Sequence, residues 1–314
     1  MSVETPSYAK LPSSPDGYRV TWGLFGETDE LGAVNLLDAE AVRRGLAAAV
    51  DGEVHSLNWN AQLPDPHPFR PSPRRTQVAH GARSRDDYLA PLYLQYSTQW
   101  DGLRHISLDS GFYNGTTAAE IDRADSGTLG IQGWARHGIV GRGILLDVAA
   151  TSAAEGRPFD PMTAHRISVA DLERTAQRQG SVPGRGDIVL IRTGWVEAYE
   201  ALDGAARRSL DQDLEVAGLD STPEMAEWLW DHGAVAVVAD NLAVEPMPLG
   251  PEFPRSSLHA MLIAALGMPL GELFALGGLA AACARNGRYT CLFTSSPFNV
   301  DGGVGSPGNA LAIT

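Results

Sequence analysis

The sequence predicts a mixed α/β fold, because short apolar runs alternate with amphipathic segments along the chain. Buried strands are predicted over residues 144–148, 188–191 and 235–239, where each mostly apolar run shortly follows a glycine. Helices are predicted over residues 169–179 and 223–232. Such alternation is typical of α/β architecture. At 314 residues the chain can bury a large core, either as one elaborate domain or as two smaller ones.

The N-terminal third contains two segments without periodic hydrophobicity. Residues 1–18 are rich in proline, serine and glycine and predict an extended arm, which either wraps a neighbouring subunit or is a solvated tail. Asp38 then predicts the N-cap of an amphipathic helix over residues 38–50. Residues 62–85 carry five prolines and several arginines, so we expect a long loop that could cover a site.

The charge of the chain narrows the class of partner. A formal net charge of -14 and a pI near 4.9 argue against nucleic acid and anionic membranes, both of which require a basic footprint. We therefore expect a small-molecule substrate. The first residues lack the basic and apolar pattern of a signal peptide, and only Cys283 and Cys291 could form a disulfide, so a cytoplasmic location is expected.

One short segment concentrates groups that can bind a metal or move a proton: Gln95, Gln99, Asp101 and His105. A strand is predicted over residues 92–100, because this run is rich in β-forming residues. Alternation along that strand would place Gln95, Gln99 and Asp101 on one face. A solvated sheet face would show the same alternation, and Asp101 followed by glycine also predicts a simple turn.

Near the C-terminus, residues 260–284 contain a single charged side chain, Glu272, and His259 precedes them. We expect two packed helices with a break at residues 267–269. A buried carboxylate normally neutralises, pairs with a cation or binds a metal. Asp101, His259 and Glu272 are a familiar shell for a divalent ion. The alternative is a helix-capping His259 and a Glu272 that is neutralised by an arginine.

Further candidates surround this predicted metal site. The amide oxygens of Gln95 and Gln99 could complete the metal shell, and His105 could transfer a proton because imidazole titrates near neutrality. A histidine that is only hydrogen-bonded in a loop explains His105 equally well. Trp22 and Trp100 could stack on a substrate, although core packing is the commoner use of such residues. The chain lacks a P-loop lysine, a dinucleotide fingerprint and a Gly-x-Ser-x-Gly elbow, so we expect no nucleotide cofactor.

These residues resemble the cyclase family of metal-dependent hydrolases, which includes bacterial kynurenine formamidase and isatin hydrolase. The mark of that family is His-x-Gly-Thr-His-x-Asp-x-Pro-x-His. At the same offsets this chain has Thr98, Asp101 and His105 in common with the family, whereas Gln95 and Gln99 replace the first two histidines. Other segments that resemble the family occur in the same order as in its members, and together they cover nearly the whole chain.

The resemblance implies a cyclase-like metal-dependent hydrolase domain over residues 19–314. Its expected fold is a single compact domain with a mixed, partly closed β-sheet flanked by helices, of the swivelling β/β/α type. The resemblance also implies a divalent metal held by Asp101, His259 and Glu272, with His105 as the proton shuttle. Because amide oxygens are weaker and harder donors than imidazole nitrogens, we expect one firmly bound ion, with Mn2+ favoured over Mg2+ or Zn2+.

The function that follows is hydrolysis of an amide, lactam or lactone bond of a small molecule by metal-activated water. Arg104 and His137 are the candidates for holding an anionic substrate, although each could equally be a surface group. Two alternatives stay open. One is a metal-independent cyclase or dehydratase of natural-product metabolism on the same fold, and the other is a non-catalytic ligand-binding relative. The family also implies a homo-dimer or homo-tetramer.

Overall fold

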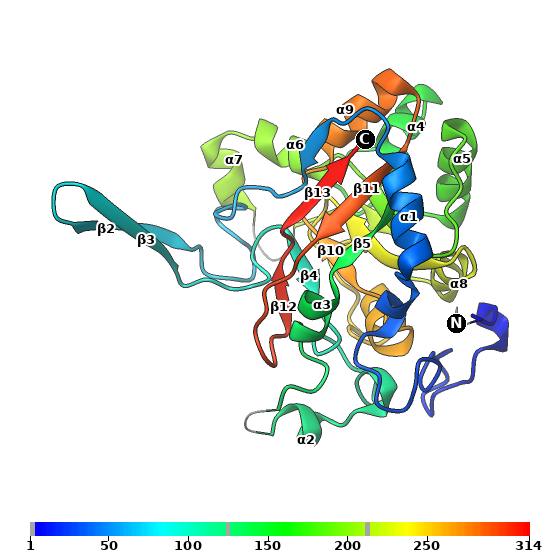
Figure 1. Cartoon of the computed structure of the whole chain (residues 1–314). Helices are drawn as coiled ribbons and strands as arrows, with labels where there is room; N and C mark the ends of the chain where they lie inside the picture. Colours follow the sequence, from blue (N-terminus) through cyan, green and yellow to red (C-terminus); the bar gives the residue numbers. More distant parts are fainter. Residues whose placement is uncertain (1–3, 124–125, 211–213) are drawn as a thin grey trace.

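A curled, mixed sheet of nine strands forms the centre of the computed structural model, which describes residues 4–123, 126–210 and 214–314 (Figure 1). The strand order is β1 (Val54–Ser56), β13 (Ala310–Ile313), β11 (Thr290–Ser295), β5 (Ile139–Asp147), β7 (Asp187–Arg192), β9 (Ala234–Ala239), β10 (Leu270–Glu272), β4 (Gln99–Asp101) and β12 (Gly305–Pro307). Neighbours from β5 to β10 pair in parallel, and the outer strands pair antiparallel. The predicted fold class, a single domain with a partly closed mixed sheet, is confirmed.

The parallel centre of the sheet is apolar because it is covered on both faces. Every residue of β9 is buried, and Ile188, Val189, Leu190 and Ile191 of β7 are fully buried. The three predicted strands are therefore confirmed as β5, β7 and β9. Helix α1 (Ala39–Ala48) packs on β5 and β11, whereas α5 (Val169–Gln179) contacts β5 and α8 (Pro223–Asp231) contacts β9.

Local capping signals set the ends of these helices. The Asp38 side chain accepts hydrogen bonds from two backbone N–H groups of the first turn of α1. Helix α5 begins with a capping box between Ser168 and Asp171 and ends at Gly180 in the left-handed conformation. The predicted helices are thus confirmed.

The other α-helices are α2 (Ala118–Ile121), α3 (Gln132–His137), α4 (Val148–Ala154), α6 (Trp195–Ala201), α7 (Gly204–Ser209) and α9 (Gly277–Asn286). The short helices are η1 (Tyr8–Lys10), η2 (Gly32–Leu36), η3 (Tyr113–Gly115) and the π-helix η4 (Ala260–Ala265).

Two predicted elements differ in the structure, and both differences shape the site. Of the strand predicted over residues 92–100, only Gln99 and Trp100 are in β4, because β4 pairs with β10 and β12 over just three residues. The two helices expected over residues 260–284 are η4 and α9, and strand β10 lies between them. Glu272 is therefore on a strand, opposite Gln99 in the antiparallel pairing of β10 with β4.

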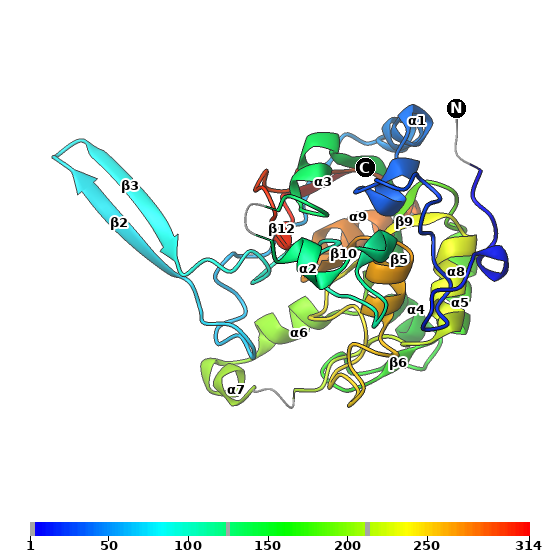
Figure 2. The ribbon, with the colours of Figure 1, turned by 90° about the horizontal axis from the view of Figure 1, so that it is seen from below.

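The proline-rich segment forms a loop only in its first half. Residues 62–73 are irregular, but β2 (Arg74–His80) and β3 (Ser84–Ala90) form a two-stranded hairpin that projects from the body of the molecule (Figures 1 and 2). Both strands are exposed along nearly their whole length. The loop predicted over residues 62–85 is corrected accordingly. A second small pair of strands joins β6 (Arg166–Ile167) to β8 (Gly218–Leu219) in parallel.

The predicted N-terminal arm lies against α8 of its own chain from residue 4 onward, and residues 1–3 lie outside the described part. The backbone N–H of Tyr8 donates to Asp231 at 2.6 Å, and the indole of Trp230 donates to the carbonyl of Pro6 at 2.9 Å. Leu11 is buried. Within the described ranges, no helix combines the length and apolar character that crossing a membrane requires.

Truncating the middle of the parallel centre should destabilise the fold strongly. Leu190→Ala removes a fully buried side chain from β7 and should lower the free energy of unfolding by about 2–5 kcal/mol, since a cavity remains. The control Leu311→Ala changes a side chain of β13 that is 38% exposed and should cost less than about 1 kcal/mol. Urea unfolding of both variants measures the difference, and equal losses would contradict this account of the core.

Candidate metal centre

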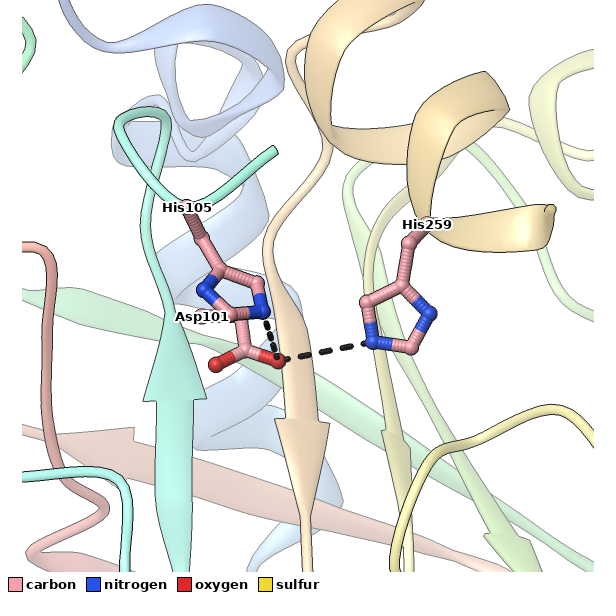
Figure 3. A group of neighbouring side chains, drawn as sticks. All are labelled: Asp101, His105 and His259. Atoms are coloured by element: carbon pink, nitrogen blue, oxygen red, sulfur yellow. Dashed lines mark ion pairs between the residues drawn. The ribbon is translucent and has the colours of Figure 1, made fainter. Parts of the chain in front are cut away.

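Acidic and imidazole side chains from three distant segments converge at the β4 and β10 end of the sheet. Asp101 ends β4, Glu272 ends β10, His259 precedes η4, and His105 lies in the loop after β4. Figure 3 shows both imidazoles directed toward Asp101. The Nε2 atom of His259 lies 3.6 Å from Asp101 Oδ2 and 3.2 Å from Glu272 Oε1, and His105 Nε2 lies 3.9 Å from Asp101 Oδ2.

The pairing of β4 with β10 explains why these side chains meet. Gln99 and Asp101 are two residues apart on β4, so both point to the face that Glu272 shares on β10. Trp100 and Gly271 are paired on the opposite face, where a Cβ at Gly271 would lie 2.8 Å from the ring of Phe274. The absence of that Cβ lets the large rings pack behind the strand and keeps the polar face toward the cavity.

His259 is the centre of a buried charge network. Its Nδ1 atom lies 2.5 Å from Glu245 Oε1, and Asp101, Glu245, His259 and Glu272 are each at most 4% exposed. Glu245 also accepts hydrogen bonds from the Ser221 hydroxyl and from the backbone N–H of Leu258. Sequence reasoning did not place Glu245 in the site. Its carboxylate fixes the ring of His259 in the manner of the carboxylate partners of metal-binding histidines.

The three buried carboxylates need positive charge nearby. Burial opposes the charged form of His259, but its hydrogen bonds to Asp101, Glu245 and Glu272 raise its pKa well above the usual value. Burial and the charge of Asp101 raise the pKa of Glu272 to about 7. For Asp101 burial raises the pKa, but the charge of His105 and the contact with His259 outweigh it and lower the value to about 2. A divalent cation can supply the same compensation as these protons.

Both glutamines lie at the cluster and turn their amide nitrogens toward the carboxylates. Gln95 Nε2 donates to Asp101 and lies 3.1 Å from His105 Nδ1, and Gln99 Nε2 donates to Glu272 Oε2 at 2.5 Å. The structure thus places the glutamines as hydrogen-bond donors, where ligating oxygens were predicted. The Oε1 atom of Gln99 is buried and has no hydrogen-bond partner in the described chain. Two carboxylates, an imidazole and this unpartnered oxygen fit the donor set of a divalent cation.

The two predicted substrate-stacking tryptophans have other roles. Trp100 is fully buried, contacts the rings of Phe274 and Phe293, and donates to Ser295 Oγ at 2.9 Å. The prediction is corrected for Trp100, because its ring lies on the core side of β4. Trp22 donates its indole N–H to the carbonyl of Ala264 at 2.9 Å and so anchors the N-terminal segment to η4.

The two predicted anion-binding residues also lie away from the cluster. The guanidinium of Arg104 donates to the backbone carbonyls of Ile121, Ser126 and Gly302, so its hydrogen bonds hold loops together. His137 is exposed at the end of α3, and its Nδ1 atom lies 2.8 Å from the carbonyl of Gly138. Neither residue lines the cavity above the metal-binding groups. The prediction for this pair is corrected, because Arg104 is held by backbone carbonyls and His137 lies outside the cavity.

A cavity of about 210 Å3 opens above the cluster. Asp101, His105, His259 and Glu272 form its polar floor, and the side chains around them are mainly apolar: Phe69, Leu242, Ala243, Met247, Leu249 and Phe253. His67 and Arg70 add polar groups from the irregular part of the proline-rich segment. The sequence assigned neither residue to the site and suggested a structural role for His67, although the segment was expected to cover a site.

Fold and site together define a cyclase-type α/β protein with a candidate divalent-metal centre. Comparison with known proteins agrees. A family model described as "Putative cyclase" matches residues 55–246, and the chain belongs to this cyclase family. A solved structure titled a novel cyclase is 30% identical, with a TM-score of 0.83, over 94% of this chain and 99% of that chain.

Two more distant structures share the fold. An isatin hydrolase bound to the product analogue thioisatinate is 18% identical, with a TM-score of 0.59, over 88% of this chain and 99% of that chain. A predicted metal-dependent hydrolase from Bacillus stearothermophilus is 15% identical, with a TM-score of 0.52, over 83% of this chain and 97% of that chain. No curated protein matches the chain.

Glu245 should tune the affinity of the site for metal. Glu245→Gln keeps a hydrogen-bonding group at His259 Nδ1 but removes the charge that orients the ring. We expect Mn2+ affinity to fall about 10- to 100-fold. Isothermal titration of Mn2+ into chelator-treated protein measures this change. The control Glu252→Gln alters an exposed glutamate nearby and should leave affinity unchanged. Equal affinities of the two variants would argue against a role for Glu245.

Proposed function

We propose that this protein is a metal-dependent hydrolase that cleaves an amide, lactam or lactone bond of a small molecule. The observation that carries the proposal is the convergence of Asp101, His259, Glu272 and His105 on the floor of one cavity. Membership of the cyclase family and the fold shared with an isatin hydrolase support it.

Asp101, Glu272 and the Nε2 atom of His259 would hold the cation, with Gln99 Oε1 as a further oxygen donor. Glu245 keeps the proton of His259 on Nδ1, which leaves Nε2 free to bind metal. Because oxygen donors outnumber nitrogen donors, Mn2+ is favoured, with Mg2+ or Zn2+ as alternatives. Bound there, a divalent cation would polarise the substrate carbonyl and lower the pKa of water.

His105 would manage the proton. Burial lowers its pKa, so the ring is neutral near pH 7 and can accept a proton. Asp101, 3.9 Å from Nε2, would stabilise the resulting imidazolium, while the Gln95 amide 3.1 Å from Nδ1 fixes the orientation of the ring. His105 can then release this proton to the nitrogen or oxygen that leaves the carbonyl carbon.

A metal-independent cyclase or dehydratase on the same fold is the second candidate. The glutamine amides favour it, because their nitrogens already satisfy the carboxylates of Asp101 and Glu272 without a cation. A non-catalytic ligand-binding protein would keep the cavity and need no proton transfer. Metal content separates the hydrolase from both alternatives, and the role of His105 separates a catalyst from a binder.

Metal removal should abolish hydrolysis. We expect the purified protein to hold about one Mn2+ per chain, because one set of oxygen and nitrogen donors is complete. Chelation should remove activity on a panel of small amides, lactams and lactones, and Mn2+ should restore it. Asp101→Asn should lose the ion. Elemental analysis and panel assays test this, and a metal-free protein whose activity resists chelation would exclude the hydrolase mechanism.

His105→Ala should lower kcat by about 10²- to 10⁴-fold, because the proton acceptor is removed. Metal content and the circular dichroism spectrum should stay unchanged. His137→Ala is the matched control, since that exposed histidine lies outside the cavity. Turnover that survives in the His105 variant would rule out the proposed proton transfer.

A further inference from the structure

The cavity above the metal-binding groups has a cation at one side, and no carboxylate in the described part of the chain pairs with it. Arg70 is half-buried and lines this cavity together with His67. The guanidinium of Arg70 lies beside the ring of His67, with 3.3 Å between Nη1 and Nε2. Burial is the main cause of the lowered pKa of His105, and the positive charge of Arg70 adds to it. The same charge opposes the rise in the pKa of Glu272 that burial and Asp101 cause. Arg70 thus lines the cavity, where it can interact with a molecule that enters.

His67 gives this corner of the cavity a surplus of hydrogen-bond donors. The Nδ1 atom of His67 accepts the backbone N–H of Phe69 at 3.1 Å, and Nη1 of Arg70 lies 3.3 Å from Nε2. A neutral imidazole has only one accepting nitrogen, so Nε2 carries the hydrogen and faces a second donor. His67 is neutral because burial and the charge of Arg70 lower its pKa to about 3. Neither donor accepts from the other, so an acceptor in the cavity can satisfy both.

The position of this donor pair is fixed by buried packing. His67 is 7% exposed, and its ring contacts that of Tyr96 with 4.9 Å between centroids. The Tyr96 hydroxyl in turn donates to the carbonyl of Pro64, three residues before His67. A site whose donors are held in place before the ligand arrives loses less entropy on binding.

The lining and volume of the rest of the cavity indicate which kind of ligand would carry the accepting group. Leu242, Ala243, Met247 and Leu249 provide an apolar wall, and Phe253 contacts His259 at the floor. The volume of about 210 Å3 lies below the range of about 300–1,000 Å3 for drug-sized ligands. The ligand is therefore compact and mainly apolar, with a group that accepts two hydrogen bonds at one side.

We infer that Arg70 and the Nε2–H of His67 bind a carboxylate of the substrate. The preferred substrates are then small, mainly apolar amides, lactams or lactones with a carboxylate remote from the bond that is cleaved. The planar guanidinium suits a carboxylate, and charge-assisted hydrogen bonds are the stronger kind. The type of bond that is cleaved rests on the proposed hydrolase function, whereas the carboxylate-binding site does not depend on it. Arg70 takes the role that the sequence suggested for Arg104 and His137.

Kinetics with paired substrates tests the inference. Each pair consists of a small amide, lactam or lactone with a carboxylate and the same molecule with a methyl group in its place. Arg70→Met should lower kcat/KM for the carboxylated member by about 10- to 100-fold, mainly through KM, because a charged hydrogen bond is lost. The methylated member should change less than about two-fold. Arg70→Lys keeps the charge without the planar fork. Its kcat/KM for the carboxylated member should therefore lie between the values of wild type and Arg70→Met.

A binding measurement keeps the test independent of catalysis. Isothermal titration of the Mn2+-loaded protein compares benzoate with benzamide, which has nearly the same shape without the charge. Wild type should bind benzoate more tightly, and Arg70→Met should lose this preference while its thermal unfolding stays unchanged.

The possible outcomes separate this inference from the proposed function. Turnover with equal losses for both members of a pair would overturn the inference and leave the hydrolase intact. The same conclusion follows if benzoate affinity is unchanged in Arg70→Met, because the carboxylate would then bind elsewhere, or if wild type does not prefer benzoate. If no panel member is hydrolysed but the benzoate preference depends on Arg70, the hydrolase fails and the carboxylate site stands.

Discussion

The burial of three carboxylates around one imidazole is the constraint on which the site depends. Asp101, Glu245 and Glu272 all contact His259, and none of the four side chains is more than slightly exposed. Uncompensated, such a group of like charges would be unfavourable in a protein interior. Protons on His259 and Glu272, or a cation between the side chains, offset that repulsion. Metal affinity and the stability of this region are therefore linked through the same atoms.

The sheet supplies the geometry that this network requires. The pairing of β10 with β9 on one side and β4 on the other fixes Glu272 relative to Gln99. A slip of one residue would turn the side chains of β4 to the other face, bringing Trp100 to the cavity and Asp101 to the core. The aromatic packing of Trp100 against Phe274 opposes that slip. The packing of the apolar face of β4 therefore determines which of its side chains face the cavity.

Sequence patterns identified the regular elements better than the contacts between loops. Helix α5 has the predicted range to the residue, and in the structure a capping box and a terminal glycine mark its ends. Glu272 was found because a lone charge in an apolar run needs a partner. Alternation along β4 could also have shown that Trp100 points away from Asp101. His67 and Arg70 gave no such signal, because their segment has no periodicity and their role arises from contacts distant in sequence.

The projecting hairpin of β2 and β3 lies between two segments of the chain that reach the site. The chain enters β2 from residues 62–73, which carry His67 and Arg70, and leaves β3 into the segment that carries Gln95. Both segments thus run into the base of the same projecting hairpin (Figure 2). Because Arg74 pairs with Ala90 at the base of the hairpin, this backbone pairing fixes where the two segments leave the body of the molecule relative to each other.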